Sequence, residues 1–340
     1  MMNLSLLLER FARFPLVEGP TPLQRLPRLE QALGGRVRLY AKRDDLMGLG
    51  LGGNKLRKLE FLIGQALEQG CDTFITTGGL QSNHARLSAA AAAKAGLACE
   101  LVLASMVAQD DPAYAGNGNL VLDELFGARI HRVAGDVDAL AVARQRAQAL
   151  AEQGRKAYVV GLGGSSPVGS LGYVACAAEL RQQEEALGLR FSHIVVPSGS
   201  VGTHAGLALG LHMLGDTPAR IQAYSVLAGA PEALRRTEDL VEAMRGLLGV
   251  AAPVPERALR VDGSQLGAGY GLPTPAMVEA LRLMARTEGL VLDPVYSGKA
   301  FAGLVDAVRS GRVEDGAAVL FVMTGGAPGL FAYPRTLLPS

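Results

Sequence analysis

The most regular feature of the chain is a short aliphatic run followed by a turn rich in glycine and serine, which occurs four times. The runs occupy residues 73–77, 157–160, 193–197 and 317–323, and helix-like stretches rich in alanine and leucine follow the first three. Short, wholly apolar strands that alternate with helices are typical of parallel sheets covered on both faces. The pattern predicts an α/β protein of mostly parallel, twisted sheets flanked by helices. Ligands bind beyond the carboxyl ends of such strands, so we expect the turns to converge on one ligand.

Local signals predict several helix ends and loops. Polar residues with a free oxygen favour the start of a helix, and glycine favours the position after its end. On these grounds the sequence predicts caps at Ser82 or Asn83 and at Ser200 or Thr203, and a helix end at Gly96. Two segments, residues 110–119 and 251–257, are predicted to be loops.

Composition limits the class of protein. The 340 residues are 49% hydrophobic and carry 33 basic and 32 acidic side chains, a net charge of +1. This apolar content suits a sizeable core and excludes a disordered chain, and the lack of basic excess argues against a sequence-independent nucleic-acid binder. Cys71, Cys99 and Cys176 are odd in number and widely spaced, which predicts no disulfide framework and a reducing compartment.

Membrane and targeting segments are not predicted. No apolar run approaches the roughly 18 residues that a membrane-spanning helix needs. The short apolar start of the chain is interrupted by charges and lacks a small-residue cleavage site. We expect a soluble, cytoplasmic protein of one large or two medium domains. No low-complexity linker is present, so the domains are expected to be interleaved in the sequence.

Residues 48–53 (GLGLGG) match the G-x-G-x-x-G dinucleotide fingerprint, and Asp72 lies about twenty residues further on. In that fingerprint the glycines directly follow a strand. Here the residues RDDLM separate the glycines from the strand predicted over residues 37–41. A nucleotide-dependent oxidoreductase is therefore an alternative with weak support.

The residues after these glycines carry a more specific signal. Lys55 follows a Gly-Gly-Asn turn at the predicted start of a helix. The positive end of the helix dipole lowers the pKa of an ammonium group there. A lysine of lowered pKa is the nucleophile that a Schiff base requires. A solvated surface lysine is the alternative interpretation.

The segment SGSVGTH, residues 198–204, joins a predicted strand to a predicted helix. Successive backbone N–H groups, hydroxyls and the helix dipole at such a place favour a dianionic phosphate. The P-loop pattern G-x-x-x-x-G-K-[ST] is absent, so the phosphate need not belong to a nucleotide. A tight capped turn without a ligand is the alternative.

Further candidates lie in two other segments. The QSNH segment, residues 81–84, begins a helix whose free N–H groups suit a carboxylate, with hydrogen bonds from Ser82 and Asn83. Tyr270 lies between two glycines and Tyr296 lies in a turn between Pro294 and Gly298, and each of these tyrosines either fills the core or moves protons. The five histidines show no metal-binding spacing and no G-x-S-x-G occurs, so neither a catalytic zinc nor a serine nucleophile is expected.

A Schiff-base lysine, a phosphate cradle, a carboxylate-binding helix start and two tyrosines together suit pyridoxal 5′-phosphate acting on an amino acid. The chain resembles the fold-type II pyridoxal phosphate enzymes of the D-cysteine desulfhydrase and 1-aminocyclopropane-1-carboxylate (ACC) deaminase family. The resemblance runs almost end to end, through GPTPL, KRDD, GGNKLRKLE, QSNHAR, SGSVGTHAGL, GYG, EGLVLDPVYSGKA and TGGAPGLFAY. It implies a tryptophan synthase β-like fold, in which a small domain (55–163) is inserted into a large cofactor-binding domain (1–54 and 164–340).

The resemblance also implies roles for individual residues. Lys55 is similar to the lysine that forms the Schiff base, Lys58 would lie near the phosphate, and Asn83 would bond the phenolic oxygen of the cofactor. The residues implied to be catalytic are Lys55, Ser82, Tyr270 and Tyr296. Those implied to contact the substrate are Ser82, Asn83, His84 and Tyr296. Further cofactor contacts are implied for Gly199, Ser200, Val201, Gly202, Thr203, Ser297 and Thr324.

The residue after the second tyrosine distinguishes members of the family. ACC deaminases resemble one another in having Glu there and Leu after TGG, whereas this chain has Ser297 and TGGA. Desulfhydrases have Ser or Thr, and a cysteate sulfo-lyase also has Ser. We expect a lyase that eliminates the β-substituent of a small amino acid, with D-cysteine as the best candidate. L-cysteate sulfo-lyase, ACC deaminase and a non-catalytic carrier of the cofactor are the alternatives.

Two further expectations follow from the resemblance. Relatives usually show GGSN where this chain has GGSS, so Ser166 bears on the expected substrate pocket. The family also implies a homodimer that takes a small amino-acid substrate and binds neither nucleic acid nor membrane.

Overall fold

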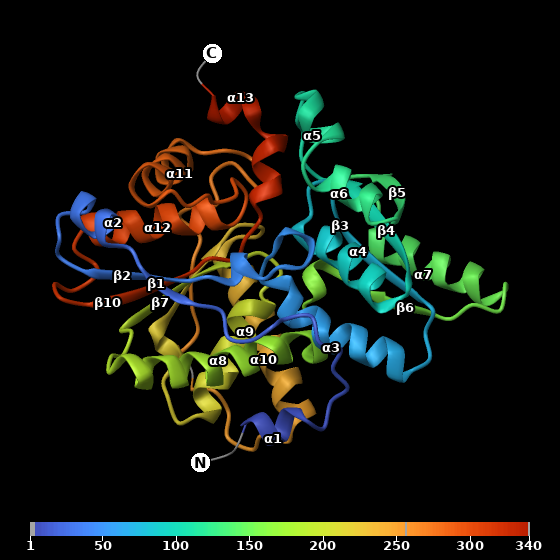
Figure 1. Ribbon diagram of the computed structural model, residues 1–340, viewed down its shortest axis with the longest axis horizontal. Coiled ribbons are helices and arrows are strands. Elements are labelled where there is room, and N and C mark those ends of the chain that lie inside the picture. Colours follow the sequence, from blue (N-terminus) through green and yellow to red (C-terminus); the bar gives the residue numbers. More distant parts are fainter. Residues whose placement is uncertain (1–3, 256, 339–340) are drawn as a thin grey trace.

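The computed structural model of the protein describes residues 4–255 and 257–338, whose strands form two sheets (Figure 1). The larger sheet has the strand order β1-β2-β10-β7-β8-β9, and its β1–β2 pair is antiparallel while the other pairs are parallel. Its strands are β1 (Leu23–Arg25), β2 (Arg38–Lys42), β7 (His193–Ser198), β8 (Ile221–Ser225), β9 (Arg260–Asp262) and β10 (Ala318–Val322).

The smaller sheet is entirely parallel, with the order β5-β4-β3-β6. Its strands are β3 (Thr73–Gly79), β4 (Ala98–Ser105), β5 (Arg129–Ala134) and β6 (Ala157–Val160). The predicted α/β architecture of mostly parallel sheets is confirmed. The four predicted aliphatic strands are β3, β6, β7 and β10, and the strand predicted over residues 37–41 is β2, displaced by one residue.

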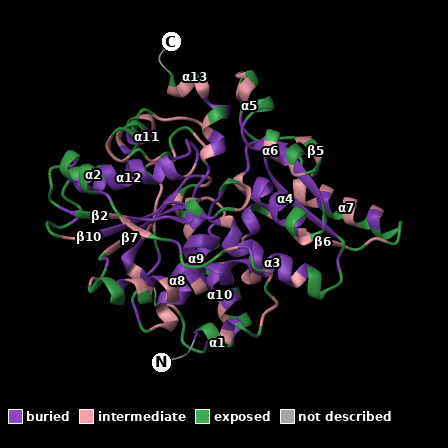
Figure 2. Cartoon of the chain, viewed as in Figure 1, coloured by how far each residue is buried: buried purple, intermediate pink, exposed green. Residues whose placement is uncertain are grey.

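Helices cover both faces of the larger sheet, which explains why its central strands are apolar throughout (Figures 1 and 2). Along β10, Leu320 and Val322 pack toward one helical layer, and Val319 and Phe321 pack toward the other. The first layer holds α1 (Leu4–Leu8), α8 (Pro167–Leu187), α9 (Gly202–Met213) and α10 (Ala230–Leu248). The second holds α2 (Pro27–Ala32), α11 (Pro275–Glu288) and α12 (Ser297–Arg309).

The smaller sheet is covered in the same way. Phe74 of β3 packs toward α3 (Lys55–Glu68) and α4 (Asn83–Ala95), whereas Ile75 packs toward α7 (Ala139–Ala151). The remaining helices are α5 (Pro112–Gly116), α6 (Asn119–Leu125) and α13 (Pro334–Leu337). Short 3-10 helices occur at η1 (Asp44–Leu46), η2 (Leu49–Leu51), η3 (Leu162–Gly164), η4 (Pro218–Arg220) and η5 (Ala327–Ala332).

Two of the predicted helix ends are confirmed. Ser82 caps α4, because its side chain accepts a hydrogen bond from the Ala85 N–H at 3.1 Å. Gly96 ends α4 in the left-handed conformation, with φ of 71°. Both ends depend on residues within a few positions of the helix, which is why the sequence revealed them.

The predicted cap of the helix after β7 is wrong. Val201 occupies that position, and no side chain caps α9. The expected caps have other partners: Ser200 Oγ accepts from Ser165, and Thr203 Oγ1 accepts from Asn54. These partners lie far away in the sequence, so tertiary contacts replace the local cap.

The loop prediction for residues 110–119 is also wrong, because the segment contains α5 and the first residue of α6. Asp111 caps α5 by accepting from the Ala113 N–H at 3.0 Å, and Pro112 follows at the first helical position, where proline is favoured. Within the other predicted loop, residues 251–255 and 257 belong to no helix or strand, and Glu256 lies outside the described residues.

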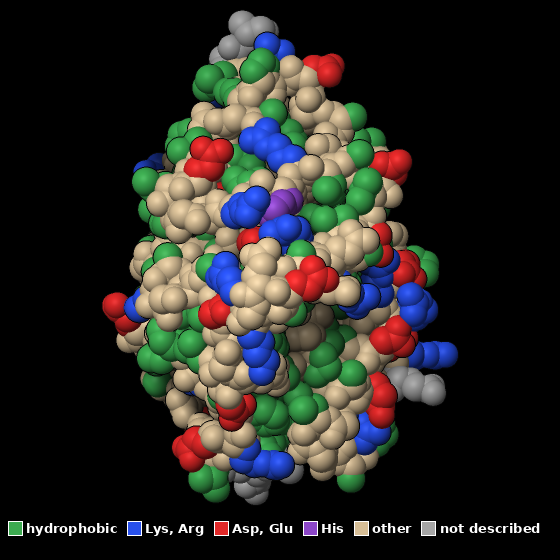
Figure 3. All heavy atoms as spheres, turned by 90° about the vertical axis from the view of Figure 1, so that its right-hand side faces the viewer, with side chains coloured by type: hydrophobic (Ala, Val, Ile, Leu, Met, Phe, Trp, Pro, Cys, Tyr) green, Lys and Arg blue, Asp and Glu red, His purple; other side chains and the backbone are tan. Residues whose placement is uncertain are grey.

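The surface carries charges of both signs. Figure 3 shows the face on the right-hand side of Figure 1, where the smaller sheet lies. Basic and acidic side chains are interspersed on this face and do not form separate patches. Over residues 4–255 and 257–338, no helix is long and apolar enough to cross a bilayer.

Helix α8 approaches α3 closely at Gly172. A Cβ on Gly172 would overlap with the Arg57 carbonyl oxygen, whereas a Cβ on the exposed Gly246 of α10 would meet nothing within 4 Å. We predict that Gly172→Ala lowers the free energy of unfolding by about 1–3 kcal/mol through overpacking. The control Gly246→Ala should raise it by about 0.5–1 kcal/mol, because alanine favours a helix. Urea denaturation measures both, and equal effects would contradict the close approach at Gly172.

Candidate active site

One cavity lies where the carboxyl ends of strands from both sheets meet. It encloses about 680 Å³, part of it open to solvent, and all four glycine-rich turns identified in the sequence contribute to its wall. Lys58 and Ser297 are the expected site residues that do not line it. The expected residues that do line it are Lys55, Ser82, Asn83, His84, Gly199, Ser200, Val201, Gly202, Thr203, Tyr270, Tyr296 and Thr324.

Lys55 is the first residue of α3, and two glycines allow the chain to reach this position. Gly52 and Gly53 have φ of 71° and 136°, and a Cβ on Gly52 would overlap with the Asp45 carbonyl oxygen. Burial lowers the pKa of Lys55 to about 8, although the nearby Asp293 opposes the shift. The neutral fraction of this amine near pH 7 is therefore much larger than for a free lysine, and the neutral amine is the form that a nucleophilic role would require.

Arg57 anchors the first turn of α3 in a buried cluster of charges. Its guanidinium donates to both carboxylate oxygens of Asp44, at 2.9 and 3.1 Å, and to Glu179 of α8 at 2.7 Å. Lys42 of β2 also pairs with Glu179, and the Tyr173 hydroxyl donates to Asp44 at 2.6 Å. Loss of one partner from such a cluster would leave a buried charge unpaired, so the cluster strongly favours one position of this turn.

The turn between β7 and α9 forms a cradle of hydrogen-bond donors. Val201 has a left-handed φ of 57°, so the backbone turns sharply before Gly202 begins the helix. The first N–H groups of a helix have no acceptor within it. A Cβ on Gly202 would lie 2.6 Å from Ser165 Oγ, 2.7 Å from Lys58 Nζ and 2.8 Å from Ser170 Oγ. Only glycine therefore leaves room for these groups to converge.

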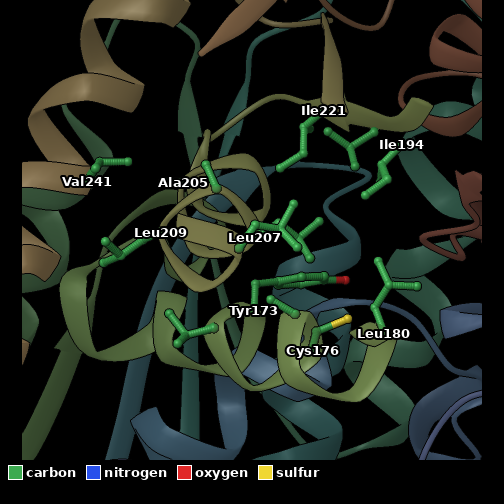
Figure 4. Packing of buried hydrophobic residues seen from close by; sticks show 14 of the residues in the cluster. Tyr173, Cys176, Leu180, Ile194, Ala205, Leu207, Leu209, Ile221 and Val241 are labelled. Carbon is green, nitrogen blue, oxygen red and sulfur yellow. The ribbon is translucent and has the colours of Figure 1, made fainter. Parts of the chain in front are cut away.

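The cradle is held in place by the apolar core behind it. Leu207 and Leu209 of α9 belong to one buried apolar cluster with side chains of α8 and of the neighbouring strands, such as Ile194 of β7 and Ile221 of β8 (Figure 4). Close-packed protein interiors deform little. The N-terminus of α9 therefore presents its N–H groups in a fixed direction.

Lys58 is a buried cation beneath the cradle. Its Nζ donates to Ser165 Oγ at 2.8 Å and to the Gly163 carbonyl oxygen at 3.1 Å, and no ion pair forms with a carboxylate of the described residues. Burial, and then the proximity of Lys55, hold the pKa of Lys58 well below its usual value. The nearby Ser198 Oγ is buried without a hydrogen-bond partner. A phosphate dianion would satisfy these groups, so the residues present fit a phosphate.

The start of α4 provides polar groups on the opposite wall. Ser82 caps the helix through its oxygen, which leaves the hydroxyl hydrogen free to donate. Asn83 is the first residue of α4, and its Oδ1 accepts from Asn119 at 3.1 Å. The first N–H groups of a helix have no acceptor within it, so binding of a carboxylate at this helix start stays a prediction.

His84 is neutral, and its hydrogen bonds assign its tautomer. Thr76 Oγ1 donates to the Val160 carbonyl oxygen at 3.0 Å and lies 2.8 Å from His84 Nε2, so Nε2 must carry the hydrogen. Nδ1 is then an acceptor, and it is buried without a partner in the described chain. Burial, followed by Lys55 and Lys58, holds the pKa of His84 well below its usual value.

Tyr270 and Tyr296 form a pair at the cavity wall. Their hydroxyl oxygens lie 2.6 Å apart, and their rings meet edge to face with centroids 5.9 Å apart. Burial raises the pKa of Tyr270 to about 12 and that of Tyr296 well above its usual value. Lys299 of α12 donates to the Gly269 carbonyl oxygen at 2.9 Å and so fixes the turn before Tyr270. Both hydroxyls are protonated near pH 7, and one hydrogen remains available beyond the shared bond.

Ser297 forms hydrogen bonds with Asp293 through its hydroxyl and does not line the cavity. Its Oγ donates to Asp293 Oδ2 at 2.7 Å and accepts from the Asp293 N–H at 2.8 Å. The same carboxylate accepts from the Tyr296 N–H at 2.7 Å. Asp293 therefore organises the turn that carries Tyr296, and it uses the Ser297 hydroxyl to do so.

The sequence did not single out three residues that shape the site. Ser165 Oγ donates to Ser200 Oγ at 2.8 Å and accepts from Lys58 Nζ. Asn54 Nδ2 donates to Thr203 Oγ1 at 3.0 Å. The third residue is Asp293, whose carboxylate accepts from the Tyr296 N–H. Ser165 belongs to a glycine-rich turn at a strand end, so its position carried a usable signal. Asn54 acts through a contact with Thr203, far away in the sequence, that no local pattern reveals. Asp293 accepts from N–H groups two to four residues further on, so a local turn signal was available for it.

Two other features of the sequence lie off the cavity wall. Ser166 caps α8, where its Oγ accepts from the Gly169 N–H at 3.1 Å. The glycine run at 48–53 lies between η1 and α3 and does not directly follow a strand. Asp72 is exposed, and its carboxylate accepts from Thr73 at 2.5 Å.

Comparison with known proteins identifies the family. A family model described as pyridoxal-phosphate dependent enzyme matches residues 15–325. The chain belongs to this family. D-cysteine desulfhydrases from Salmonella newport (strain SL254) and Salmonella heidelberg (strain SL476) are each 44% identical over 328 residues, which cover 96% of this chain and 97% of each relative. The predicted cofactor, pyridoxal phosphate, and the enzyme class, a pyridoxal-phosphate-dependent lyase or deaminase, are thereby confirmed.

Solved structures support the same conclusion. The crystal structure of an ACC deaminase homologue has a TM-score of 0.87 and 38% identity, and the match covers 99% of both chains. A mutant of O-ureido-L-serine synthase with bound O-ureido-L-serine has a TM-score of 0.64 at 18% identity, covering 98% of this chain and 95% of that one, and shares the fold. The predicted fold type II is confirmed.

The lowered pKa of Lys55 predicts how cofactor binding depends on pH. In the apoprotein, the rate at which Lys55 reacts with pyridoxal phosphate should rise with pH and level off above about pH 8, because only the neutral amine reacts. A lysine of ordinary pKa would give a rate that still rises at about pH 10. The growth of the visible absorbance band measures the rate, and Lys55→Ala should show no band. A rate that has not levelled off by about pH 10 would contradict the lowered pKa.

The lack of a counter-charge at Lys58 predicts two effects of opposite sign. Lys58→Met should weaken pyridoxal phosphate binding by roughly 10- to 100-fold, the loss expected for a hydrogen bond to a charged group. The apoprotein should be at least as stable, because an apolar side chain replaces a buried ammonium. Fluorescence titration and thermal denaturation measure the two effects. Pyridoxal, which lacks the phosphate, is the control ligand, and an equal loss for both ligands would contradict the assignment.

Proposed function

We propose that the protein eliminates the β-substituent of a small amino acid, with D-cysteine as substrate. Elimination releases hydrogen sulfide, and water then hydrolyses the remaining 2-aminoacrylate to pyruvate and ammonia. The observation that carries this proposal is the presence of a lysine of lowered pKa and a pair of protonated tyrosines in the wall of one cavity, which supply a base and proton donors. The 44% identity to D-cysteine desulfhydrases supports a thiol as the leaving group.

Different residues of the cavity would bind different parts of the cofactor. Lys55 would hold it covalently, and Lys58, Ser165 and the N–H groups of the cradle would hold its phosphate. Asn83 would face its phenolic oxygen. When bound, pyridoxal phosphate supplies the electron sink that stabilises negative charge at the substrate Cα.

The chain itself would orient the substrate and move the protons. The N–H groups at the start of α4 and the Ser82 hydroxyl bind the substrate carboxylate. Lys55 Nζ takes the proton from Cα, because its pKa of about 8 makes it the strongest base in the cavity wall that is partly neutral near pH 7. The Cβ–S bond then breaks with its electron pair on sulfur. The Tyr270–Tyr296 pair donates to this sulfur, since both hydroxyls are protonated.

ACC deamination is the second candidate, because one similar solved structure, with a TM-score of 0.87, is that of an ACC deaminase homologue. Ser297 argues against it. ACC deaminases resemble one another in having Glu at that position, whereas the Ser297 hydroxyl is neutral and bound to Asp293. Elimination of sulfite from L-cysteate is compatible with a serine there and is the other rival reaction.

A substrate panel tests the proposal. D-cysteine, L-cysteine, L-cysteate, D-serine and ACC are assayed side by side with the holoenzyme, and we predict the highest kcat/KM for D-cysteine, measured as pyruvate and sulfide release. Lys55→Ala should abolish turnover. A higher kcat/KM for ACC or L-cysteate would refute D-cysteine as the substrate. Cofactor binding without product from any compound would indicate a carrier.

We further propose that residues 55–163 form a small domain inserted between residues 1–54 and 164–340, which form the large cofactor-binding domain. This division is supported by the sheets, since the strands of the smaller sheet all fall within residues 55–163 and those of the larger sheet outside it. A cytoplasmic homodimer is proposed from the family resemblance, and sedimentation velocity distinguishes a dimer from a monomer.

A further inference from the structure

Arg86 is a fully buried cation close to the cavity, and it is not among the residues proposed to bind the cofactor or the substrate. It lies in α4, three residues after Asn83, and its side chain is shielded from solvent. Its guanidinium donates to the Gly52 carbonyl oxygen at 2.7 Å and to Asn119 Oδ1 at 2.9 Å, and it reaches Asn83 Oδ1 at 3.5 Å. The arginine therefore contacts both the turn before Lys55 and the residue expected beside the cofactor ring.

The donor-only chemistry of arginine fixes the orientation of Asn119. A guanidinium has no acceptor, so Asn119 must present Oδ1 to Arg86. Its Nδ2 then points the other way and donates to Asn83 Oδ1 at 3.1 Å and to the Gln81 carbonyl oxygen at 3.0 Å. The Asn119 N–H also donates to Gln81 Oε1 at 2.9 Å. These bonds hold the start of α6 against the start of α4.

The same reasoning fixes Asn83. Its Oδ1 faces two donors, so a rotation of the amide by half a turn would place N–H groups against N–H groups. Asn83 Nδ2 has no acceptor among the described residues, and it is not one of the fully buried atoms without a partner, so it is accessible from the cavity. A Cβ on Gly326 would lie 2.6 Å from this nitrogen, so glycine there leaves it room.

We infer that Arg86 and Asn119 are positioning residues that set the direction of the Asn83 amide, so that an N–H donor and not the oxygen faces the cofactor. The inference rests on the proposed function, because Asn83 is expected beside the phenolic oxygen of pyridoxal phosphate. A donor stabilises the ionised form of that oxygen. A reversed amide would place one oxygen against another and favour the protonated form instead.

Two buried acids face Arg86 without neutralising it. Burial lowers the pKa of Arg86 to about 10, and Asp123 and Asp293 oppose this shift from beyond ion-pair distance. Burial also raises the pKa of Asp123 to about 8, although Arg86 opposes this, and both of its carboxylate oxygens lack partners within the described chain. Arg86 therefore stays charged near neutral pH, and the direction of the hydrogen-bond chain is constant over that range.

Asn119→Asp tests the inference in the holoenzyme. The introduced carboxylate can accept from Arg86 but cannot donate to Asn83. We expect the pH midpoint of the visible absorbance band of the bound cofactor to rise by about one unit, the tenfold change in proton affinity expected for one lost hydrogen bond to a charged group. Asn119→Leu removes the donor without adding a charge and should shift the midpoint in the same direction.

Asn117→Asp is the matched control. It adds the same charge two residues away at an exposed position, where Oδ1 accepts from the Gly118 N–H at 2.7 Å and a carboxylate can still do so. This variant should keep the wild-type midpoint. A shift equal to that of Asn119→Asp would mean that added charge, and not the lost donor, moves the midpoint, which would overturn the inference.

A double-mutant cycle separates positioning through Asn83 from a general structural effect. In an Asn83→Ala background, Asn119→Asp should cause no further shift. The inference is overturned if both Asn119 variants keep the wild-type midpoint, or if Asn119→Asp shifts it fully in the Asn83→Ala background. A wild-type protein that shows no visible band after incubation with pyridoxal phosphate would overturn the proposed function itself, so the two failures are distinguishable.

Discussion

The site depends above all on the buried ion pairs of Arg57. The first turn of α3 carries Lys55, Arg57 and Lys58, and Arg57 ties that turn to Asp44 and Glu179 on the side of the larger sheet. Burying two further ammonium groups nearby is costly, and a mobile turn would let them reach water. Because Arg57 fixes the turn, both lysines stay desolvated. Their lowered pKa values are therefore a consequence of where Arg57 holds the helix.

The two parallel sheets provide the second constraint, since they bring turns from distant parts of the sequence to one place. These turns approach so closely that side chains would not fit at several positions. A Cβ on Gly199 would lie 2.9 Å from the Tyr296 ring, and one on Gly325 would lie 2.8 Å from the Gly53 Cα. Glycine is thus required at these positions, where backbone segments from different turns meet.

The sequence predicted those parts of the structure that local physics determines. The strands β3 and β6 are short apolar runs, and Ser82 caps the residues beside it, so patterns of a few residues sufficed. The cap of α9 could not be predicted, because Asn54 and Ser165 engage the oxygens of Thr203 and Ser200 from other elements. In the site, motifs identified the residues that line the cavity. Partners from distant parts of the chain that orient them, such as Asn54, become visible only when the chain is folded.

Two lysines beside the cavity, Lys55 and Lys58, have no carboxylate of the described chain paired with them. Asp293, the acid whose charge acts on Lys55, is already occupied by the N–H groups and the hydroxyl of its own turn. A ligand that carries a phosphate and a carboxylate supplies the missing anions, and an opposite charge nearby favours the protonated form of a lysine. A phosphate held against Lys58 therefore shifts the pKa of this lysine back toward its usual value. The same desolvation that keeps Lys55 neutral enough to react also leaves the donors of the cradle without a counter-charge from the described chain, so reactivity and cofactor affinity have one physical origin.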